Sequence, residues 1–274
     1  MTFLGKIALA CAVAALPLST AQSQDAPRAA DYAPVSGQEG KDVVWVPTAQ
    51  ALVDRMLTMA KITPDDFVVD LGSGDGRTVI TAAKRGVRAH GIEYNPELVA
   101  LSERNAKEAG VDKLATFERA DIFQSDFSKA TVVTLFLLPA LNVKLRPTLL
   151  GMKPGTRVVS NSFDMGDWEP DGRIEAGGSN CTSYCRAMMW VIPAKVGGAW
   201  RLGDGALQLT QTYQMLGGTL TRGRKVFPIS SARMAGTSIT FTAGGKRYDG
   251  RVDHGTMTGH TEGGGAWTAT RVGH

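Results

Sequence analysis

This chain of 274 residues has few long apolar runs, few histidines and little excess of charge of one sign. Lysine and arginine total 30 against 26 aspartates and glutamates, and both signs are dispersed, so no nucleic-acid partner is expected. The four histidines are scattered without metal-ligand spacing, so no metal site is predicted. The longest N-terminal apolar run, at 7–18, is shorter than the roughly 20 residues that a transmembrane helix needs.

The first 21 residues are typical of a cleavable secretory signal peptide. Lys6 precedes the apolar run, and small and polar residues follow it, with Ser19 and Ala21 placed for cleavage after Ala21. We therefore expect an exported, periplasmic protein without a transmembrane span. A cytoplasmic protein and one anchored in the membrane by an uncleaved N-terminus are the alternatives.

Cysteine is also rare, with three residues in the whole chain. Cys11 lies in the predicted signal peptide, which leaves Cys181 and Cys185 in the motif NCTSYC. A close pair in an oxidising compartment indicates a disulfide. Two buried thiols are the alternative.

Four segments are predicted along the chain: a signal peptide (1–21), a flexible linker (22–42), an α/β domain (43–195) and an antiparallel β-domain (196–274). Within 43–195, buried strands alternate with amphipathic helices, which indicates a doubly wound, mostly parallel sheet with helices on both faces. Asn95 is expected to cap the helix that begins at Pro96, and Thr48 the helix at 49–60.

The pattern changes in the last 79 residues, counted from 196 to 274, where apolar and polar residues alternate in short runs separated by glycines. This pattern predicts a small antiparallel barrel or curved sheet. The motif GGAW occurs at 197–200 and again at 264–267. We expect the first and last strands to pair there, with both tryptophans in the core.

A glycine-rich turn, DLGSGDGR at 70–77, follows the first strand of the α/β domain. Ligands of open α/β sheets bind at the carboxyl ends of the strands, and glycine allows the backbone to approach them closely. Glu93 ends the next strand, 21 residues after Gly72, where a carboxylate accepts hydrogen bonds from ribose hydroxyls. Asp121 follows the third strand and suits an adenine amino group, with Ile122 or Phe123 against the ring.

The charge at this turn distinguishes two cofactors. A dinucleotide site requires G-x-G-x-x-G with pyrophosphate over the helix N-terminus, but position 77 is arginine, and Asp70 and Asp75 would repel pyrophosphate. S-adenosylmethionine carries an ammonium and a sulfonium and no phosphate, so nearby carboxylates favour it. S-adenosylmethionine is therefore the predicted cofactor.

The motifs DLGSGDGR, GIEYNP and ERADIF resemble those of class I methyltransferases, over roughly 43–193. The resemblance implies a Rossmann-like sheet of seven strands. VPTAQALVDRML at 46–57 and the segment 137–163 are similar to the non-SET histone lysine methyltransferases and to mitochondrial enzymes that methylate lysines of membrane-embedded carriers and of the ATP synthase. Together, the motif analysis and the resemblance assign the cofactor to Thr48, Asp70, Gly72, Ser73, Gly74, Asp75, Gly76, Glu93, Tyr94, Asp121 and Ile122.

The sequence departs from these families in two places. The histone branch has asparagines before the proline of LLPALN, where this chain has TLFLL at 134–138. The Asp/Asn-Pro-Pro-Tyr signature of amide and base methyltransferases is also absent, which disfavours DNA-base methylation. The β-domain has no counterpart in either lysine-directed branch, and its partner is not predicted.

The acceptor side of the site is predicted as an apolar channel, because low polarity disfavours the charged form of a lysine amine. The candidates are Phe136, Leu138, Phe163 and Trp168, with Asn142 orienting the substrate; a core position is the alternative for Phe136 and Leu138.

Three functions are compatible with the sequence: a protein-lysine N-methyltransferase, a small-molecule methyltransferase, or a non-catalytic envelope module that acts through the β-domain. S-adenosylmethionine is made in the cytoplasm, so the predicted export of the protein conflicts with the predicted cofactor. Three explanations are open: the signal-peptide prediction is wrong, the cofactor is supplied outside the cytoplasm, or the site binds another ligand.

Overall fold

The computed structural model describes residues 32–175, 181 and 183–273. The predicted signal peptide and the beginning of the predicted linker lie outside the described residues. The helices and strands below all belong to one unit, Pro34–His274. Within the described ranges, no helix has the length and apolar character needed to cross a membrane.

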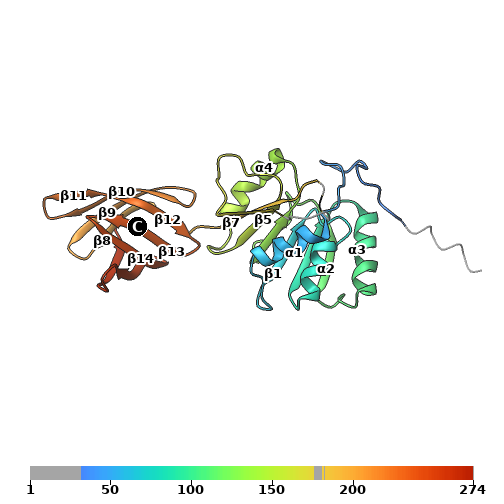
Figure 1. Cartoon of the computed structure of the whole chain (residues 1–274), viewed down its shortest axis with the longest axis horizontal. Coiled ribbons are helices and arrows are strands. Elements are labelled where there is room, and N and C mark those ends of the chain that lie inside the picture. The colour runs from blue at the N-terminus through green and yellow to red at the C-terminus, as the bar shows by residue number, and fades with distance from the viewer. Residues whose placement is uncertain (1–31, 176–180, 182, 274) are drawn as a thin grey trace, which may run out of the picture. The chain divides into compact units, whose positions relative to one another are not determined.

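The first sheet has seven strands in the order β3-β2-β1-β4-β5-β7-β6 (Figure 1). Strands β1 to β5 run parallel, and β7 is antiparallel to both β5 and β6. The predicted methyltransferase sheet is therefore confirmed. The strands are β1 (Phe67–Leu71), β2 (Arg88–Glu93), β3 (Ala115–Arg119), β4 (Val132–Leu135), β5 (Arg157–Asn161), β6 (Gly172–Glu175) and β7 (Arg186–Val191).

Successive strand residues point to opposite faces of this sheet, and helices cover both faces. Val68 packs in the cluster formed by α1 and α2, whereas Val69 and Leu71 pack in the cluster that contains α4. Asn95 caps α3 as predicted, with Oδ1 accepting a hydrogen bond from Glu97 N at 2.8 Å. The helices are α1 (Gln50–Met59), α2 (Arg77–Lys84), α3 (Pro96–Glu108) and α4 (Pro139–Leu150).

The predicted cap at Thr48 is wrong. Helix α1 begins one residue later than that prediction requires, with Ala49 at the N-cap position and no side-chain cap. The Thr48 hydroxyl instead accepts a hydrogen bond from Asn161 Nδ2 at 3.1 Å. This partner lies 113 residues away in the sequence, and local spacing could not indicate it.

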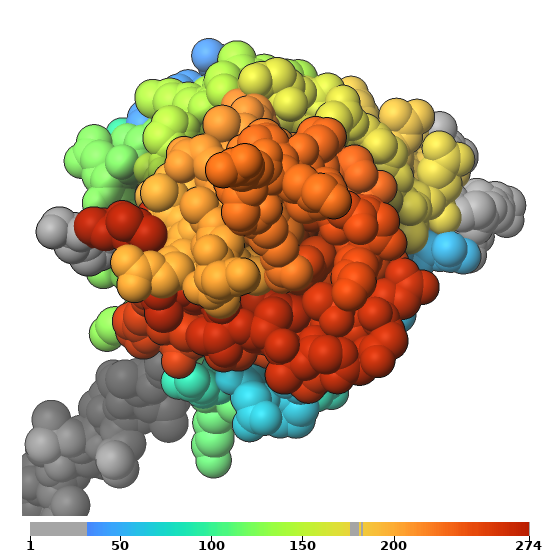
Figure 2. Space-filling model, turned by 90° about the vertical axis from the view of Figure 1, so that its left-hand side faces the viewer, coloured from blue at the N-terminus to red at the C-terminus, as the bar shows by residue number. Residues whose placement is uncertain are grey.

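The second sheet is antiparallel and follows the order β11-β10-β12-β13-β14-β15-β16-β8-β9, with β9 also paired to β10 so that it closes like a barrel. Strand β8 pairs with β16, and Trp200 and Trp267 are both buried, as the two GGAW motifs predicted. Figure 2 shows the outer surface of this domain in orange and red. Its strands are β8 (Gly198–Leu202), β9 (Gly205–Thr212), β10 (Met215–Arg222), β11 (Lys225–Pro228), β12 (Ser230–Ala235), β13 (Ser238–Ala243), β14 (Lys246–Asp253), β15 (Thr256–Thr261) and β16 (Ala266–Arg271).

Candidate functional site

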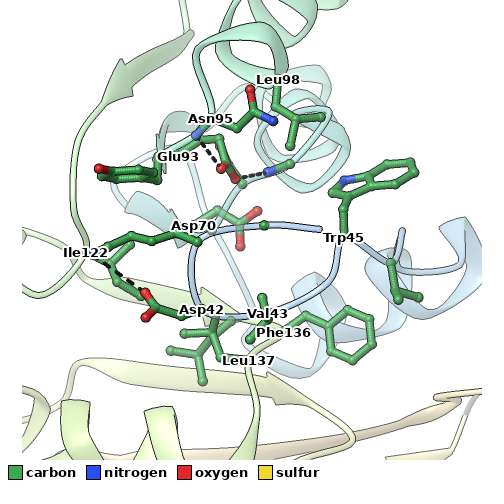
Figure 3. Close-up of a pocket in the computed structure, with 18 of the residues that line it drawn as sticks. Asp42, Val43, Trp45, Asp70, Glu93, Asn95, Leu98, Ile122, Phe136 and Leu137 are labelled. Atoms are coloured by element: carbon green, nitrogen blue, oxygen red, sulfur yellow. Dashed lines mark hydrogen bonds and ion pairs between the residues drawn. The ribbon is translucent and has the colours of Figure 1, made fainter. Parts of the chain in front are cut away.

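A pocket opens at the carboxyl ends of β1, β2 and β4 (Figure 3). Residues 38–48 form one wall of it, although the sequence assigned 38–42 to a flexible linker. Of the predicted cofactor residues, those that line the pocket are Thr48, Asp70, Gly72, Ser73, Gly74, Asp75, Glu93, Tyr94, Asp121 and Ile122. Gly76 has a packing role instead, because a Cβ there would come within 2.7 Å of the Phe117 ring.

The glycine turn is shaped by two positive backbone angles, φ 77° at Gly72 and φ 56° at Gly74, which other residues rarely adopt. The amides of Gly72 and Ser73 both donate to the carbonyl of Ile92, which joins the turn to β2. A Cβ on Gly74 would lie 2.7 Å from Trp45 Nε1. The indole of Trp45 therefore closes over the turn at a distance that only glycine permits.

Glu93 is held in a fixed orientation by the backbone. Its Oε2 accepts from Gly74 N at 3.0 Å and its Oε1 accepts from Asn95 N at 2.9 Å (Figure 3). Each carboxylate oxygen has a second lone pair that these bonds leave free. The carboxylate can therefore accept hydrogen bonds from a diol in the pocket while it stays tied to the glycine turn.

Asp70 is a buried carboxyl group at the end of β1, 7% exposed, and burial raises its pKa to about 7. Hydrogen bonds from Thr134 Oγ1, at 2.6 Å, and from Thr78 oppose this shift, and the negative charges of Glu93 and Asp75 add to it. No ion pair to Asp70 occurs within the described ranges. A cationic ligand would supply the charge that favours its ionised form.

Asp121 pairs with Lys41, a residue of the pocket wall that the sequence did not identify. Lys41 Nζ donates to Oδ2 at 2.6 Å, and Phe123 N donates to Oδ1 at 2.9 Å. These bonds lower the pKa of Asp121, the one from Lys41 most. The Lys41 ammonium also lies 4.8 Å from the centre of the Tyr94 ring. The predicted adenine site is thus partly covered by residues 38–48.

Asp75 does not offer a free carboxylate to the pocket. Arg77 binds both of its oxygens, with Nη2 at 2.5 Å from Oδ2 and Nε at 2.9 Å from Oδ1. Arg77 Nη1 also donates to the carbonyl of Thr48 at 2.8 Å. This chain of contacts ties the glycine turn to the segment before α1, and Asn161 fixes the Thr48 side chain from the other side. Asn161 is a further residue that sequence analysis missed.

The acceptor candidates divide into two groups. Phe136 lines the pocket, and the Phe163 ring lies 6.0 Å from it between centroids. Leu138 is 46% exposed at the start of α4 and is not among the residues that line the pocket. Phe136 and Phe163 are therefore the predicted channel residues that the structure brings together.

The predicted channel positions of Trp168 and Asn142 are not supported. Trp168 is fully buried in the core, where its ring packs against Trp190 and Tyr213 and its Nε1 donates to Gln214 Oε1 at 2.8 Å. Asn142 is also fully buried, and its Nδ2 donates to the carbonyls of Phe163 and Asp164. Asn142 therefore positions the loop that carries Phe163, and it does not face substrate.

The pocket suits S-adenosylmethionine by its own chemistry. It presents the carboxyl groups of Asp70, Glu93 and Asp121, and the buried Ser73 Oγ has no hydrogen-bond partner in the described part of the chain. Acceptors of this kind match a ligand that carries an ammonium, a ribose diol and an adenine amino group. Among the described residues no cluster could hold a metal ion.

Comparison with known proteins agrees with this chemistry. A family model described as the ANTKMT methyltransferase domain matches residues 70–172. Over 147 residues, the chain is 44% identical to the protein-lysine N-methyltransferase of Saccharolobus islandicus, covering 52% of this chain and 91% of that protein. The adenine nucleotide translocase lysine N-methyltransferase of Mus musculus is 33% identical over 144 residues, 52% of this chain and 62% of that one.

A solved structure shows the same fold with a ligand of the expected kind. It is an RNA methyltransferase from Salinibacter ruber in complex with S-adenosyl-L-homocysteine, 48% identical, with a TM-score of 0.51. The match covers 55% of this chain and 96% of that one. The predicted cofactor, S-adenosylmethionine, and the predicted enzymatic activity are confirmed by these relatives. The chain belongs to the family of S-adenosylmethionine-dependent methyltransferases that includes the protein-lysine N-methyltransferase of Saccharolobus islandicus.

Proposed function

We propose that this enzyme methylates lysine side chains of proteins, and that it does so outside the cytoplasm. The main observation in favour of a lysine acceptor is that the wall of the pocket after β4 is apolar and is formed by Phe136 and Leu137. Relatives that are 44% and 33% identical are named as lysine methyltransferases, which supports the same acceptor.

The reaction needs a neutral amine in line with the methyl group. The bound cofactor supplies a methyl carbon on a sulfonium. Apolar surroundings at Phe136 lower the pKa of an entering lysine ammonium, which then releases its proton to water. Asp70, Glu93 and Asp121 would hold the cofactor, which would supply its methyl group to the neutral nitrogen and leave as S-adenosylhomocysteine with the S–C bond electrons on sulfur. The work of the protein is alignment of the two reactants.

RNA is the second candidate acceptor, because the relative from Salinibacter ruber is described as an RNA methyltransferase. Two features of this chain argue against RNA. Its 30 basic residues are nearly matched by 26 acidic ones, and the signature that binds a base or amide nitrogen is absent after β4, where the sequence reads LFLLPA. A small-molecule acceptor remains the alternative to protein.

Methyl labelling separates these acceptors. The purified enzyme is incubated with S-adenosylmethionine labelled in its methyl group and with protein, RNA and small-molecule fractions of the same cells. We expect label in the protein fraction alone, and none with the double variant Glu93→Ala, Asp121→Ala. Label confined to RNA or to the small-molecule fraction would overturn the proposed acceptor.

Export rests on two observations. Residues 1–21 have the pattern of a signal peptide, and the structure joins Cys181 to Cys185 in a disulfide, a bond that persists in oxidising compartments. N-terminal sequencing of the chain purified from the cell envelope tests this proposal. We expect Gln22 as the first residue, whereas a chain that retains Met1 in the cytoplasmic fraction would contradict it.

A further inference from the structure

Three aromatic rings meet beside the pocket, and each comes from a different element. Phe136 follows β4, Phe163 follows β5, and Tyr184 precedes β7. Because β7 is antiparallel to β5, its beginning lies at the edge of the sheet where β4 and β5 end. Tyr184 lies 5.2 Å from Phe136 and 5.8 Å from Phe163 between ring centroids. We call these three residues the aromatic wall.

Tyr184 is the exposed member of the aromatic wall, at 45%, whereas Phe136 and Phe163 are half-buried. Its backbone has φ 54°, a left-handed conformation that a residue with a side chain rarely adopts. The next residue, Cys185, is bonded to Cys181, and both cysteines pack against the core cluster beneath α1. The disulfide therefore anchors the backbone that presents Tyr184 to the two phenylalanines.

The chemistry of the aromatic wall suits a long aliphatic group with a cationic end. The alkyl part of such a group packs against ring surfaces, and its ammonium is attracted to ring faces. Centroid separations of 5.2 to 6.0 Å place the rings in contact with one another, so the cation must lie on their shared surface and not between them. Phe136 joins this surface to the pocket that holds the cofactor.

We infer that the Cys181–Cys185 disulfide is a positioning device for the acceptor: it holds Tyr184 against Phe136 and Phe163, and the aromatic wall binds the cationic side chain that enters to be methylated. This inference rests on the proposed lysine acceptor. Cofactor binding does not depend on it, because Tyr184 and the two cysteines do not line the cofactor pocket. Loss of the disulfide should weaken acceptor binding and leave cofactor binding intact.

The test uses n-butylammonium as a probe for the lysine side chain, with S-adenosylhomocysteine bound to the protein. Binding is followed by NMR of labelled aromatic rings, for the oxidised protein, the protein reduced with dithiothreitol, and the variants Tyr184→Ala and Tyr184→Phe. Reduction converts the disulfide to two thiols while the reagent forms its own cyclic disulfide. Calorimetry on each sample measures the dissociation constant of S-adenosylhomocysteine.

We expect the dissociation constant of the probe to rise about two- to fivefold in Tyr184→Ala and on reduction, with that of S-adenosylhomocysteine unchanged. Tyr184→Phe should bind the probe nearly as tightly as the wild type, because it keeps the aromatic ring. The double variant Cys181→Ser, Cys185→Ser should bind the probe weakly and be insensitive to dithiothreitol. Met215→Ala, at a 53% exposed apolar side chain in β10, is the matched control and should behave as wild type.

Equal probe binding before and after reduction would overturn the role of the disulfide. Absence of probe binding to the oxidised wild-type protein would overturn the aromatic wall as an acceptor site. Neither outcome resembles failure of the proposed function, in which methyl label appears in RNA or small molecules whatever the probe does.

Discussion

Lys41 Nζ lies 2.6 Å from Asp121 Oδ2, so the carboxylate predicted to bind adenine already has a cationic partner within its own chain. The pair is accessible to solvent, with side-chain exposures of 33% and 16%. Residues 38–48 thus contact the rest of the pocket lining through the Lys41–Asp121 ion pair and through close approach of the Trp45 indole to Gly74.

Replacing Lys41 should strengthen cofactor binding. The ammonium competes for Asp121 and also repels a ligand that is itself cationic. Because exposed ion pairs are weak, Lys41→Ala should lower the dissociation constant of S-adenosylmethionine by about two- to fivefold. Calorimetric titration measures this change. Lys129→Ala is the matched control in the same domain, and weaker binding by Lys41→Ala alone would show that Lys41 holds the wall in place and does not compete.

Asp70 should make cofactor binding depend on pH. In the free protein burial raises its pKa from 3.8 to about 7, whereas a bound ammonium favours the carboxylate and lowers the pKa again. Binding therefore releases a proton below about pH 7, and affinity should rise about tenfold between about pH 6 and about pH 8. Asp70→Asn should bind more weakly and show a flat profile, and an unchanged slope in that variant would assign the effect to another group.

The same shift has a consequence for stability. A carboxyl group whose pKa is raised in the folded state stabilises that state fully below its unfolded pKa, 3.8, and the stabilisation is lost as pH rises through about 7. The free enzyme should therefore lose stability across this window, and Asp70→Asn should lose less. Denaturant unfolding at several pH values measures both. Parallel profiles for the two proteins would contradict the shift.

Glu93 should be essential for cofactor binding because two backbone amides, Gly74 N and Asn95 N, hold its carboxylate toward the pocket. Hydrogen bonds to a charged acceptor are stronger than neutral ones, so Glu93→Ala should weaken S-adenosylmethionine binding by about 10- to 100-fold. Glu93→Gln keeps the shape but loses the charge and one acceptor, and should fall between the wild type and Glu93→Ala. A small effect of Glu93→Ala on the dissociation constant would contradict the assignment of the ribose hydroxyls to this side chain.

Asn142 should affect stability and acceptor binding together. Its Nδ2 donates to the carbonyls of Phe163 and Asp164, at 3.2 and 3.0 Å. Asn142→Ala removes the donor to the Asp164 carbonyl, whereas the Phe163 carbonyl keeps its hydrogen bond from Ser160 Oγ at 2.7 Å, and the variant should lower the free energy of unfolding by about 1–3 kcal/mol. Chemical denaturation measures this loss. The variant should also raise the KM for acceptor and leave cofactor affinity unchanged, whereas an unchanged KM would separate Asn142 from the acceptor site.

The sequence predicted which residues line the pocket because each lies at or just after the end of a strand. Gly72 and Asp121 follow β1 and β3, Glu93 ends β2, and the carboxyl ends of such parallel strands meet at one edge. The acceptor side was harder, since an apolar side chain in the sequence looks the same in a core as in a channel. Trp168 shows this ambiguity, because its partner Gln214 belongs to the β-domain.

Contacts over long sequence separations were also missed. Lys41 reaches Asp121 across 80 residues from a segment rich in turn-forming residues, which carried no signal of regular structure. Asn161 reaches Thr48 across 113 residues. For Tyr184 a local signal did exist, because an aromatic residue enclosed by a close cysteine pair is presented by a covalent loop. The disulfide was predicted, but the ring it positions was not.

The central claim, that a lysine nitrogen accepts the methyl group at this site, is tested most directly by amino-acid analysis of the labelled protein fraction. After the wild-type enzyme has transferred the label and the protein has been hydrolysed to its amino acids, we expect the label in N-methylated lysine. The same analysis should yield no labelled lysine with the double variant Glu93→Ala, Asp121→Ala. Label recovered in any other amino acid, with methyllysine unlabelled, would contradict the account.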